Sequence, residues 1–117
     1  MKTIIAGSRT IRQYSLVEQA VKNSNFSITE VLSGGANGVD GLGERFAKQN
    51  EIPCIRRKAD WKKYRRSAGI RRNQEMVKEA DALIAIWDGK SPGTSHVIQA
   101  AKKKGIPVYV LNLSLID

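Results

Sequence analysis

The sequence predicts an α/β protein with a Rossmann-like three-layer sandwich, built on a five-stranded, mostly parallel sheet with the strand order 3-2-1-4-5. Three observations predict this class. Short apolar segments alternate along the chain with longer segments of helical periodicity. The segment Asp81–Trp87 is almost continuously apolar, as expected of a central parallel strand that is buried on both faces. Glycine and hydroxyl-bearing residues follow three of the predicted strands, where such sheets bind their ligands.

The first half of the chain contains two predicted strands and two predicted helices. Lys2–Ala6 is a short apolar run that leads into a glycine-serine turn, which indicates the first strand. Tyr14–Asn23 carries apolar residues at helical spacing. Ile28–Leu32 is β-branched and apolar and stops at a Ser-Gly-Gly sequence, which is typical of a strand. Val39–Gln49 has the pattern of an amphipathic helix.

The second half continues the alternation. Ile52–Ile55, which contains a proline, is the predicted third strand, and Arg72–Glu79 is the next helix. After the central strand comes the helix Gly93–Lys104, which ends in three lysines followed by a glycine and then a proline. That combination is a C-terminal stop signal for a helix. Val108–Leu111 is the predicted fifth strand.

The composition is that of one globular domain. The chain has 117 residues, of which 41% are hydrophobic and 26% charged, and we expect a single domain over residues 1–117. Cys54 is the only cysteine, which excludes an intrachain disulfide. It lies inside a predicted strand, where we expect it to be a small buried hydrophobic residue. No segment is apolar and long enough to span a membrane, and the N-terminus lacks the apolar core of a signal peptide. We therefore expect a cytoplasmic protein with no membrane partner.

The net charge of +9 is concentrated in one segment. Arg56–Arg72 contains nine lysines and arginines against Asp60 alone, a local charge of +8, so the rest of the chain is close to neutral. Such a patch attracts nucleic acid or phosphorylated ligands, although a solvated surface loop would have the same composition.

The loop after the first strand is the first candidate for ligand binding. Gly7 permits close approach of the backbone, the hydroxyl of Ser8 can donate to phosphate oxygens, and Arg9 can bind a phosphate through two hydrogen bonds. An ordinary βα turn with an exposed arginine would have the same sequence.

The loop after the second strand is richer in glycine and leads into a helix N-terminus. Its backbone can present free N–H groups and the positive end of the helix dipole to an anion. Asp40 would repel a phosphate, so we expect it to bind a ribose hydroxyl, to order the loop backbone or to complement the helix dipole. The other candidate residues of this loop are Ser33, Gly34, Gly35 and Ala36.

The loop after the fourth strand offers a second anion site. Ser91, Gly93 and Thr94 stand at the start of the last helix, and Asp88 precedes them as a further candidate contact. Trp87 is a candidate for stacking on a base, although an aromatic residue that ends a buried strand more often belongs to the core.

No residue pattern indicates a metal site or a catalytic nucleophile. The single histidine, His96, has no cysteine or carboxylate at metal-ligand spacing, so we expect it to lie on the surface or to pack there. We therefore predict neither a metal nor a cofactor.

These loops together resemble the SLOG superfamily, which includes the LOG cytokinin-activating enzymes and the DprA/Smf DNA-binding proteins. The similarity is greatest to its small YspA/YpsA-related branch. The matching segments follow the order and spacing of the family over essentially the whole chain; they are Gly7-Ser8-Arg9, LSGGANGVDGLGERFA at 32–47, ADWKKYRRSAGIRRNQEM at 59–76, ADALIAIWDG at 80–89 and Ser91-Pro92-Gly93-Thr94.

The resemblance implies a pocket for nucleotides or nucleotide-derived ligands, formed by the same loops and by an arginine-asparagine element. Here that element contains Arg71, Arg72 and Asn73. The resemblance also places Trp61 and Tyr64 near the pocket rim, with Trp61 a candidate for stacking on a base; the alternative for both is packing against the basic segment. Related proteins form dimers or larger assemblies, so we expect a homo-oligomer.

The resemblance transfers function only in part. LOG-type phosphoribohydrolases carry a Gly-Gly-x-Gly-Thr-x-x-Glu motif whose glutamate acts in cleaving the N-glycosidic bond, and Val97 occupies that position here. Valine cannot transfer a proton. We therefore expect a protein that binds a phosphorylated nucleotide derivative, such as an ADP-ribose-like or cyclic nucleotide signal, without catalysis. Two alternatives are a LOG-type N-glycosidase that uses another acid, and a single-stranded nucleic-acid binder that uses Arg56–Arg72.

Overall fold

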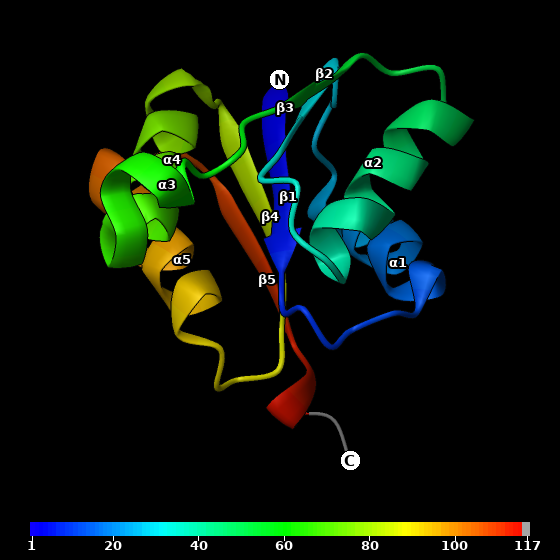
Figure 1. The fold of residues 1–117 in the computed structure, drawn as a ribbon. Coiled ribbons are helices and arrows are strands. Elements are labelled where there is room, and N and C mark those ends of the chain that lie inside the picture. The colour runs from blue at the N-terminus through cyan, green and yellow to red at the C-terminus, as the bar shows by residue number, and fades with distance from the viewer. Residues whose placement is uncertain (116–117) are drawn as a thin grey trace.

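A computed structural model describes residues 1–115 as a three-layer α/β/α sandwich. The central sheet has five strands in the order β3-β2-β1-β4-β5, and all four neighbouring pairs are parallel (Figure 1). This confirms the predicted class and strand order, with an entirely parallel sheet in place of a mostly parallel one. The strands are β1 (Lys2–Gly7), β2 (Glu30–Ser33), β3 (Cys54–Arg56), β4 (Ala82–Trp87) and β5 (Val108–Asn112).

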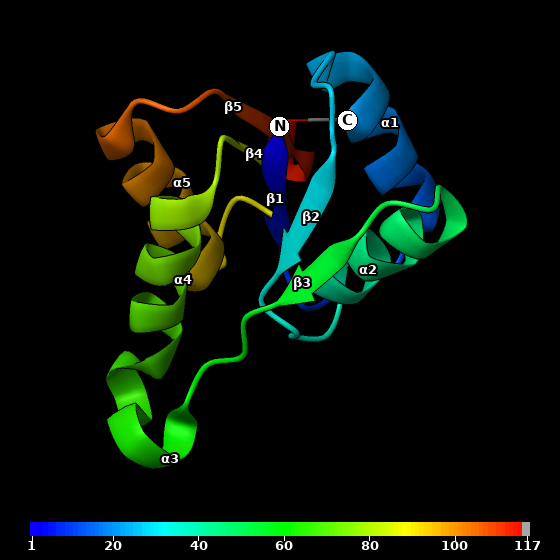
Figure 2. The ribbon, with the colours of Figure 1, turned by 90° about the horizontal axis from the view of Figure 1, so that it is seen from above.

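Helices cover both faces of the sheet. The helices α1 and α2 pack on one face, and α3, α4 and α5 lie on the other (Figures 1 and 2). Two short 3-10 turns follow α3 and β5, at Arg65–Ser67 and Leu113–Leu115. The helices are α1 (Tyr14–Ser24), α2 (Val39–Gln49), α3 (Trp61–Tyr64), α4 (Ala68–Glu79) and α5 (Pro92–Lys104).

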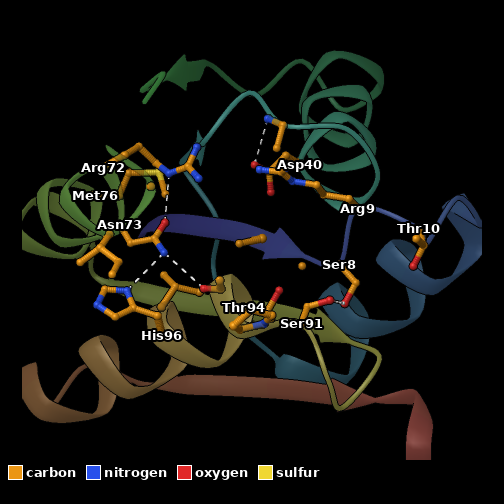
Figure 3. Close-up of a pocket in the computed structure, with 18 of the residues that line it drawn as sticks. Ser8, Arg9, Thr10, Asp40, Arg72, Asn73, Met76, Ser91, Thr94 and His96 are labelled. Carbon is orange, nitrogen blue, oxygen red and sulfur yellow. Dashed lines mark hydrogen bonds between the residues drawn. The ribbon is translucent and has the colours of Figure 1, made fainter. Parts of the chain in front are cut away.

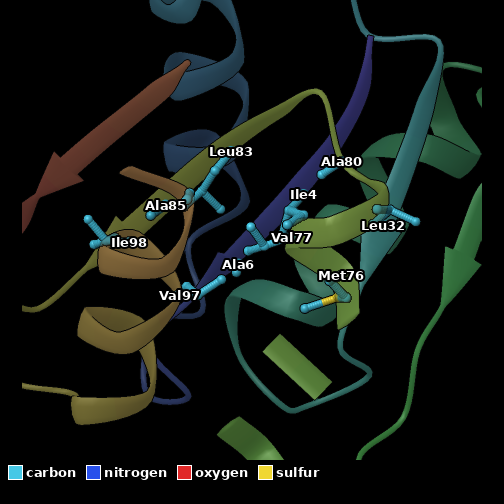
Figure 4. Close-up of a cluster of buried hydrophobic side chains, with 11 residues drawn as sticks. Ile4, Ala6, Leu32, Met76, Val77, Ala80, Leu83, Ala85, Val97 and Ile98 are labelled. Carbon is cyan, nitrogen blue, oxygen red and sulfur yellow. The ribbon is translucent and has the colours of Figure 1, made fainter. Parts of the chain in front are cut away.

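The core consists of two apolar clusters, one on each face of the sheet. The cluster beneath α4 and α5 includes Ile4, Leu83 and Met76, which are at most 1% exposed (Figure 4). The cluster beneath α1 and α2 is built around Ile5 and Ile84, which are fully buried. Successive residues of β1 and β4 thus face opposite clusters, as the period of two along a strand requires.

Several element boundaries differ from the predicted ones, and for the strands the hydrogen bonds to the neighbouring strand set them. The strand β2 begins at Glu30, two residues later than predicted, since the ladder with β1 starts where the N–H of Thr29 donates to the carbonyl of Met1 at 3.0 Å. The strand β3 likewise starts at Cys54, after the proline, which has no N–H to donate. The helix α4 begins at Ala68, four residues earlier than predicted, so both arginines of the arginine-asparagine element lie inside it.

The prediction that Cys54 is a buried hydrophobe is wrong, because the thiol is exposed. The strand β3 has only three residues and lies at the edge of the sheet, where only Ile55 of the three is partly buried and packs on the core. Because successive side chains alternate between faces, Cys54 points away from that cluster. Desolvation, with Glu44 as the next cause, raises the pKa of the thiol above its ordinary value.

The helix α3 was not predicted. Two of its four residues are lysines and the other two are aromatic, a segment too short to show an apolar period. Asp60 caps it by accepting a hydrogen bond from the N–H of Lys63 at 3.0 Å. None of the helices in residues 1–115 combines the length and the apolar character that crossing a bilayer requires.

Candidate functional site

A cavity of about 560 Å3 lies at the carboxyl ends of β1 and β4, between the loops that follow them and the helices α4 and α5 (Figure 3). This is the edge at which parallel sheets of this kind bind ligands. Its lining contains three arginines, one carboxylate, four hydroxyl groups and one histidine. The residues are Ala6, Gly7, Ser8, Arg9, Thr10, Ala36, Asp40, Trp61, Arg66, Gly69, Ile70, Arg72, Asn73, Met76, Ser91, Pro92, Gly93, Thr94, His96 and Val97.

The backbone of Ser8 holds the first loop against its two neighbours. Its N–H donates to the carbonyl of Ile86 on β4 at 3.1 Å, and its carbonyl accepts from the N–H of Val39 at the start of α2 at 3.4 Å. Gly38 has φ +75°, and a Cβ atom there would lie 2.5 Å from the carbonyl oxygens of Ser8 and Arg9. The glycine before α2 is therefore required for the close approach of these two loops.

The side chain of Ser8 joins the first loop to the loop after β4. Its Oγ accepts from the N–H of Asp88 at 3.0 Å and lies within hydrogen-bond distance, 3.1 Å, of the hydroxyl oxygen of Ser91. The carboxylate of Asp88 accepts from the N–H groups of Ser91 and Lys90 at 2.8 Å each and from the Ser91 hydroxyl at 3.0 Å. The backbone N–H of Ser91, then that of Lys90, lower the pKa of Asp88 to about 2. Asp88 is therefore a structural anion of this loop.

The helix α5 directs its N-terminus into the cavity. Ser91 is the N-cap residue, but its hydroxyl is used by Ser8 and Asp88 and makes no capping bond. Pro92 at the first helical position has no N–H, and the amides of Gly93 and Thr94 belong to the first turn, which lacks intrahelical partners. These amides and the helix dipole favour an anion at this point.

Arg72 connects α4 to the loop after β2. Its Nη1 donates to the carbonyl of Gly34 at 2.7 Å and its Nε donates to Oδ1 of Asn73 at 3.0 Å. A Cβ atom on Gly34 would lie 2.4 Å from Nη1, so the guanidinium needs a glycine there. Desolvation lowers the pKa of Arg72, Asp40 opposes that shift, and the positive charge of Arg9 adds to it. Two arginines thus converge on the cavity, which favours a negatively charged ligand.

Asp40 is a buried carboxylic acid at the start of α2. It is 5% exposed, and its Oδ2 accepts from the N–H of Ala36 at 3.1 Å. Burial raises its pKa from 3.8 to about 6, against the lowering effects of the Ala36 N–H and of Arg72. Asp40 and Arg72 extend toward the same part of the cavity (Figure 3).

The raised pKa of Asp40 predicts a pH dependence of stability. Between pH 3.8 and about 6 the folded chain binds a proton that the unfolded chain releases, so the stabilisation is present at low pH and is lost as the pH rises through 6. We expect the unfolding free energy of the wild type, minus that of Asp40→Asn, to fall by about 1–3 kcal/mol from pH 4 to pH 8. Urea titrations at both pH values measure it, and a difference that is constant or rises with pH would contradict the assignment.

The structure brings most of the predicted site residues together. Ten of them line the cavity: Gly7, Ser8, Arg9, Ala36, Asp40, Trp61, Asn73, Ser91, Gly93 and Thr94. The others lie outside its lining: Ser33, Gly34, Gly35, Arg71, Trp87 and Asp88.

The residues outside the lining have structural contacts. The hydroxyl of Ser33 donates to Glu44 at 2.6 Å, and Trp87 packs on the core and donates from its indole to the carbonyl of Ser91 at 3.1 Å. The guanidinium of Arg71 lies over the ring of Tyr64, 4.4 Å from its centroid, and lines a second hollow on the basic side of α4.

Sequence reasoning identified Asn73 of α4 but missed its neighbours Gly69, Ile70 and Met76 on the same helical face, and it missed the histidine of α5. Gly69, Ile70, Asn73 and Met76 follow the spacing of a single helical face, and that spacing could have indicated a shared surface. His96 is partly buried and lines the cavity, where Nδ2 of Asn73 lies 3.3 Å from its Nδ1. Within residues 1–115, no group of three or more His, Cys, Asp or Glu side chains could hold a metal ion.

Comparisons with known proteins place the chain among related sequences. The model of the YspA, cpYpsA-related SLOG family matches residues 1–64. The Gene 61 protein of Mycobacterium phage D29 is 36% identical over 118 residues, which cover 92% of this chain and 93% of that protein. UPF0398 proteins of Bacillus thuringiensis (strain Al Hakam) and Bacillus cereus (strain AH187) are 43% identical over 35 residues, 29% of this chain and 19% of each of those proteins. No solved structure matches the chain significantly.

Proposed function

Because the chain belongs to the YspA, cpYpsA-related SLOG family, we propose that it binds a phosphorylated nucleotide derivative without turning it over. One observation carries this proposal: Arg9, Arg72 and the N-terminus of α5 converge on one cavity. Arg66 adds a third cation, and Asp40 is the one acidic side chain among the described residues of the lining.

The volume and the polarity of the cavity fit this class of ligand. Small-molecule sites commonly enclose about 300–1,000 Å3, combining apolar walls with a few convergent polar groups. The cavity has a volume of about 560 Å3, and four residues with hydroxyl groups line the end of it that the loops form: Ser8, Thr10, Ser91 and Thr94. Phosphate oxygens accept hydrogen bonds from hydroxyls, amide N–H groups and arginines.

Val97 supports binding without cleavage of the glycosidic bond. It lines the cavity on α5 and is 2% exposed. By the resemblance of the sequence, it stands where LOG-type phosphoribohydrolases carry their catalytic glutamate. An aliphatic side chain there offers neither a general acid nor a general base.

Calorimetric titration tests the proposal. We expect at least one of ADP-ribose, cyclic dinucleotides and nucleoside monophosphates to bind with a dissociation constant in the micromolar range, and chromatography to recover that ligand unchanged. The absence of binding to all of them would overturn the proposal. The Lys103→Ala variant, altered in the last turn of α5 away from the cavity, serves as a control and should bind like the wild type.

A specific observation favours the alternative of an N-glycosidase. Asp40 is a buried acid in the cavity whose pKa of about 6 lies near neutrality, as an acid-base group requires. The chromatographic arm of the same experiment decides between the two functions, because free base released by the wild type but not by Asp40→Asn would establish hydrolysis.

Single-strand binding by Arg56–Arg72 is supported by the second hollow, of about 730 Å3, on the basic side of α4. Two of its cations are already paired: Arg56 with Glu44, and Arg57 with Glu79 at 2.8 Å. Titration with a single-stranded oligonucleotide at several salt concentrations separates this function, because neutralising several phosphates makes affinity fall steeply with salt.

A further inference from the structure

The helical wall of the cavity differs in chemistry from its loop wall. Beside its polar side chains it carries an apolar group formed by Trp61 of α3 with Ile70 and Met76 of α4, and two of these three side chains are unusually open to solvent. Trp61 is 51% exposed and Ile70 is 46% exposed, and with Leu115 they are the exposed large hydrophobic residues of the described chain. A large apolar surface left open inside a polar cavity indicates a ligand with an apolar part.

The indole of Trp61 is seated on α4. A Cβ atom added to Gly69 would lie 3.4 Å from Cη2 of the indole, so the ring rests at contact distance over that helical turn. The cap of α3 by Asp60 fixes the backbone that carries the ring. Part of the indole therefore packs on α4, and about half of the Trp61 side chain is open to solvent, where a planar ligand can stack on it.

A chain of hydrogen bonds from Arg72 through Asn73 determines which ring nitrogen of His96 carries the proton. The Nε of Arg72 can only donate, so the atom of Asn73 that it meets at 3.0 Å is the oxygen, Oδ1. The nitrogen Nδ2 of Asn73 then donates to the carbonyl of Gly93 and to Nδ1 of His96, both at 3.3 Å (Figure 3). A ring nitrogen that accepts carries no proton, so this hydrogen bond assigns the tautomer of His96 with its proton on Nε2. Within residues 1–115 that N–H has no acceptor.

We propose that the wall between α3, α4 and α5 is a base subsite, in which Trp61 and Ile70 contact the face of a nucleobase and the Nε2–H of His96 donates to an acceptor on its edge. This inference rests on the proposed function and adds the orientation of the ligand, with its base at the helical wall and its phosphate at the loops of Ser8 and Ser91. Recognition by stacking and a single hydrogen-bond donor would favour ligands that carry a nucleobase, but it would accept more than one kind of base.

Calorimetry with adenosine monophosphate, ADP-ribose and ribose 5-phosphate tests the subsite. We expect Trp61→Ala to weaken binding of both nucleotides about tenfold, since stacking of a base on an aromatic ring contributes about 1–3 kcal/mol. Binding of ribose 5-phosphate should change less than twofold, and Trp61→Phe should restore most of the nucleotide affinity.

The histidine is tested by a matched pair of variants. In His96→Gln the side-chain amide can place an N–H near the position of Nε2–H, whereas His96→Leu removes the donor. We expect the glutamine variant to retain nucleotide affinity within about twofold and the leucine variant to lose about fivefold, because a neutral hydrogen bond contributes about 1 kcal/mol.

The outcomes separate the two proposals. If neither these three compounds nor the cyclic dinucleotides bind, the proposed function fails, and the subsite fails with it. If the nucleotides bind but Trp61→Ala and His96→Leu leave their affinity unchanged, the subsite alone is overturned. It is also overturned if Trp61→Ala changes the molecular mass in solution and not the affinity, because the indole then belongs to a subunit interface.

Discussion

Gly7→Ala is expected to lower the free energy of unfolding by about 3 kcal/mol or more, because it places a methyl group inside a backbone contact. The added Cβ would lie 2.1 Å from the carbonyl oxygen of Ile86 and 2.7 Å from Cγ2 of Val39. Neither neighbour is the end of a flexible side chain. The strand β1 would have to separate from β4 at the point where the N–H of Ser8 donates to the same carbonyl.

Gly41→Ala provides the matched control. It makes the same chemical change at an exposed position in the first turn of α2, where no atom lies within 4 Å of the added Cβ. Alanine is favoured over glycine within a helix by about 0.8–1 kcal/mol, so this variant should be more stable than the wild type. Urea denaturation measures both variants, and similar midpoints for the two would show that the contact at Gly7 can relax.

Arg72→Gln should reduce the affinity for a phosphorylated nucleotide about 100-fold. A charge-assisted hydrogen bond contributes about 1.5–3 kcal/mol, which corresponds to roughly 10- to 150-fold in a binding constant. The loss should fall toward the upper end, because Arg72 also orders the loop wall through Gly34 and Asn73. Calorimetry with the nucleotide that the wild type binds best measures the effect.

Arg71→Gln removes the same charge from the adjacent position and serves as its control. Arg71 contacts Tyr64, bonds to the hydroxyl of Ser67 at 3.1 Å and lies outside the lining of the cavity. We expect its affinity to remain within about threefold of the wild type, since long-range electrostatics at a partly screened surface site is weak. Equal losses in the two variants would show that net charge, and not the position of Arg72, governs binding.

The layers and the strand order could be predicted because the central elements have unambiguous patterns. The strand β4 is apolar along its whole length, and α2 begins and ends at the predicted residues. The edge strand β3 could not be placed in the same way. It has three residues with little burial, so pairing with β2 defines it more than its own composition does.

The loops of the site could be predicted from glycine and hydroxyl residues. On the helical wall the resemblance indicated Trp61 and Asn73, whereas the rest of that wall could not be predicted. Arg71 and Arg72 are adjacent and chemically identical in sequence. Only the orientation of α4 turns one into the cavity and the other onto Tyr64. Because successive residues of a helix point about 100° apart, and the helix begins four residues before its predicted start, sequence alone could not choose between them.

The hydrogen bonds of Ser8 have a consequence for the kinetics of binding. They hold the loops after β1 and β4 and the start of α2 in one arrangement through contacts within the protein. A preorganised site loses little conformational entropy when a ligand enters, and association needs no prior rearrangement of these loops. Ligands that share a phosphate and differ in their base should therefore associate at similar rates, and their residence times should set the preference among them.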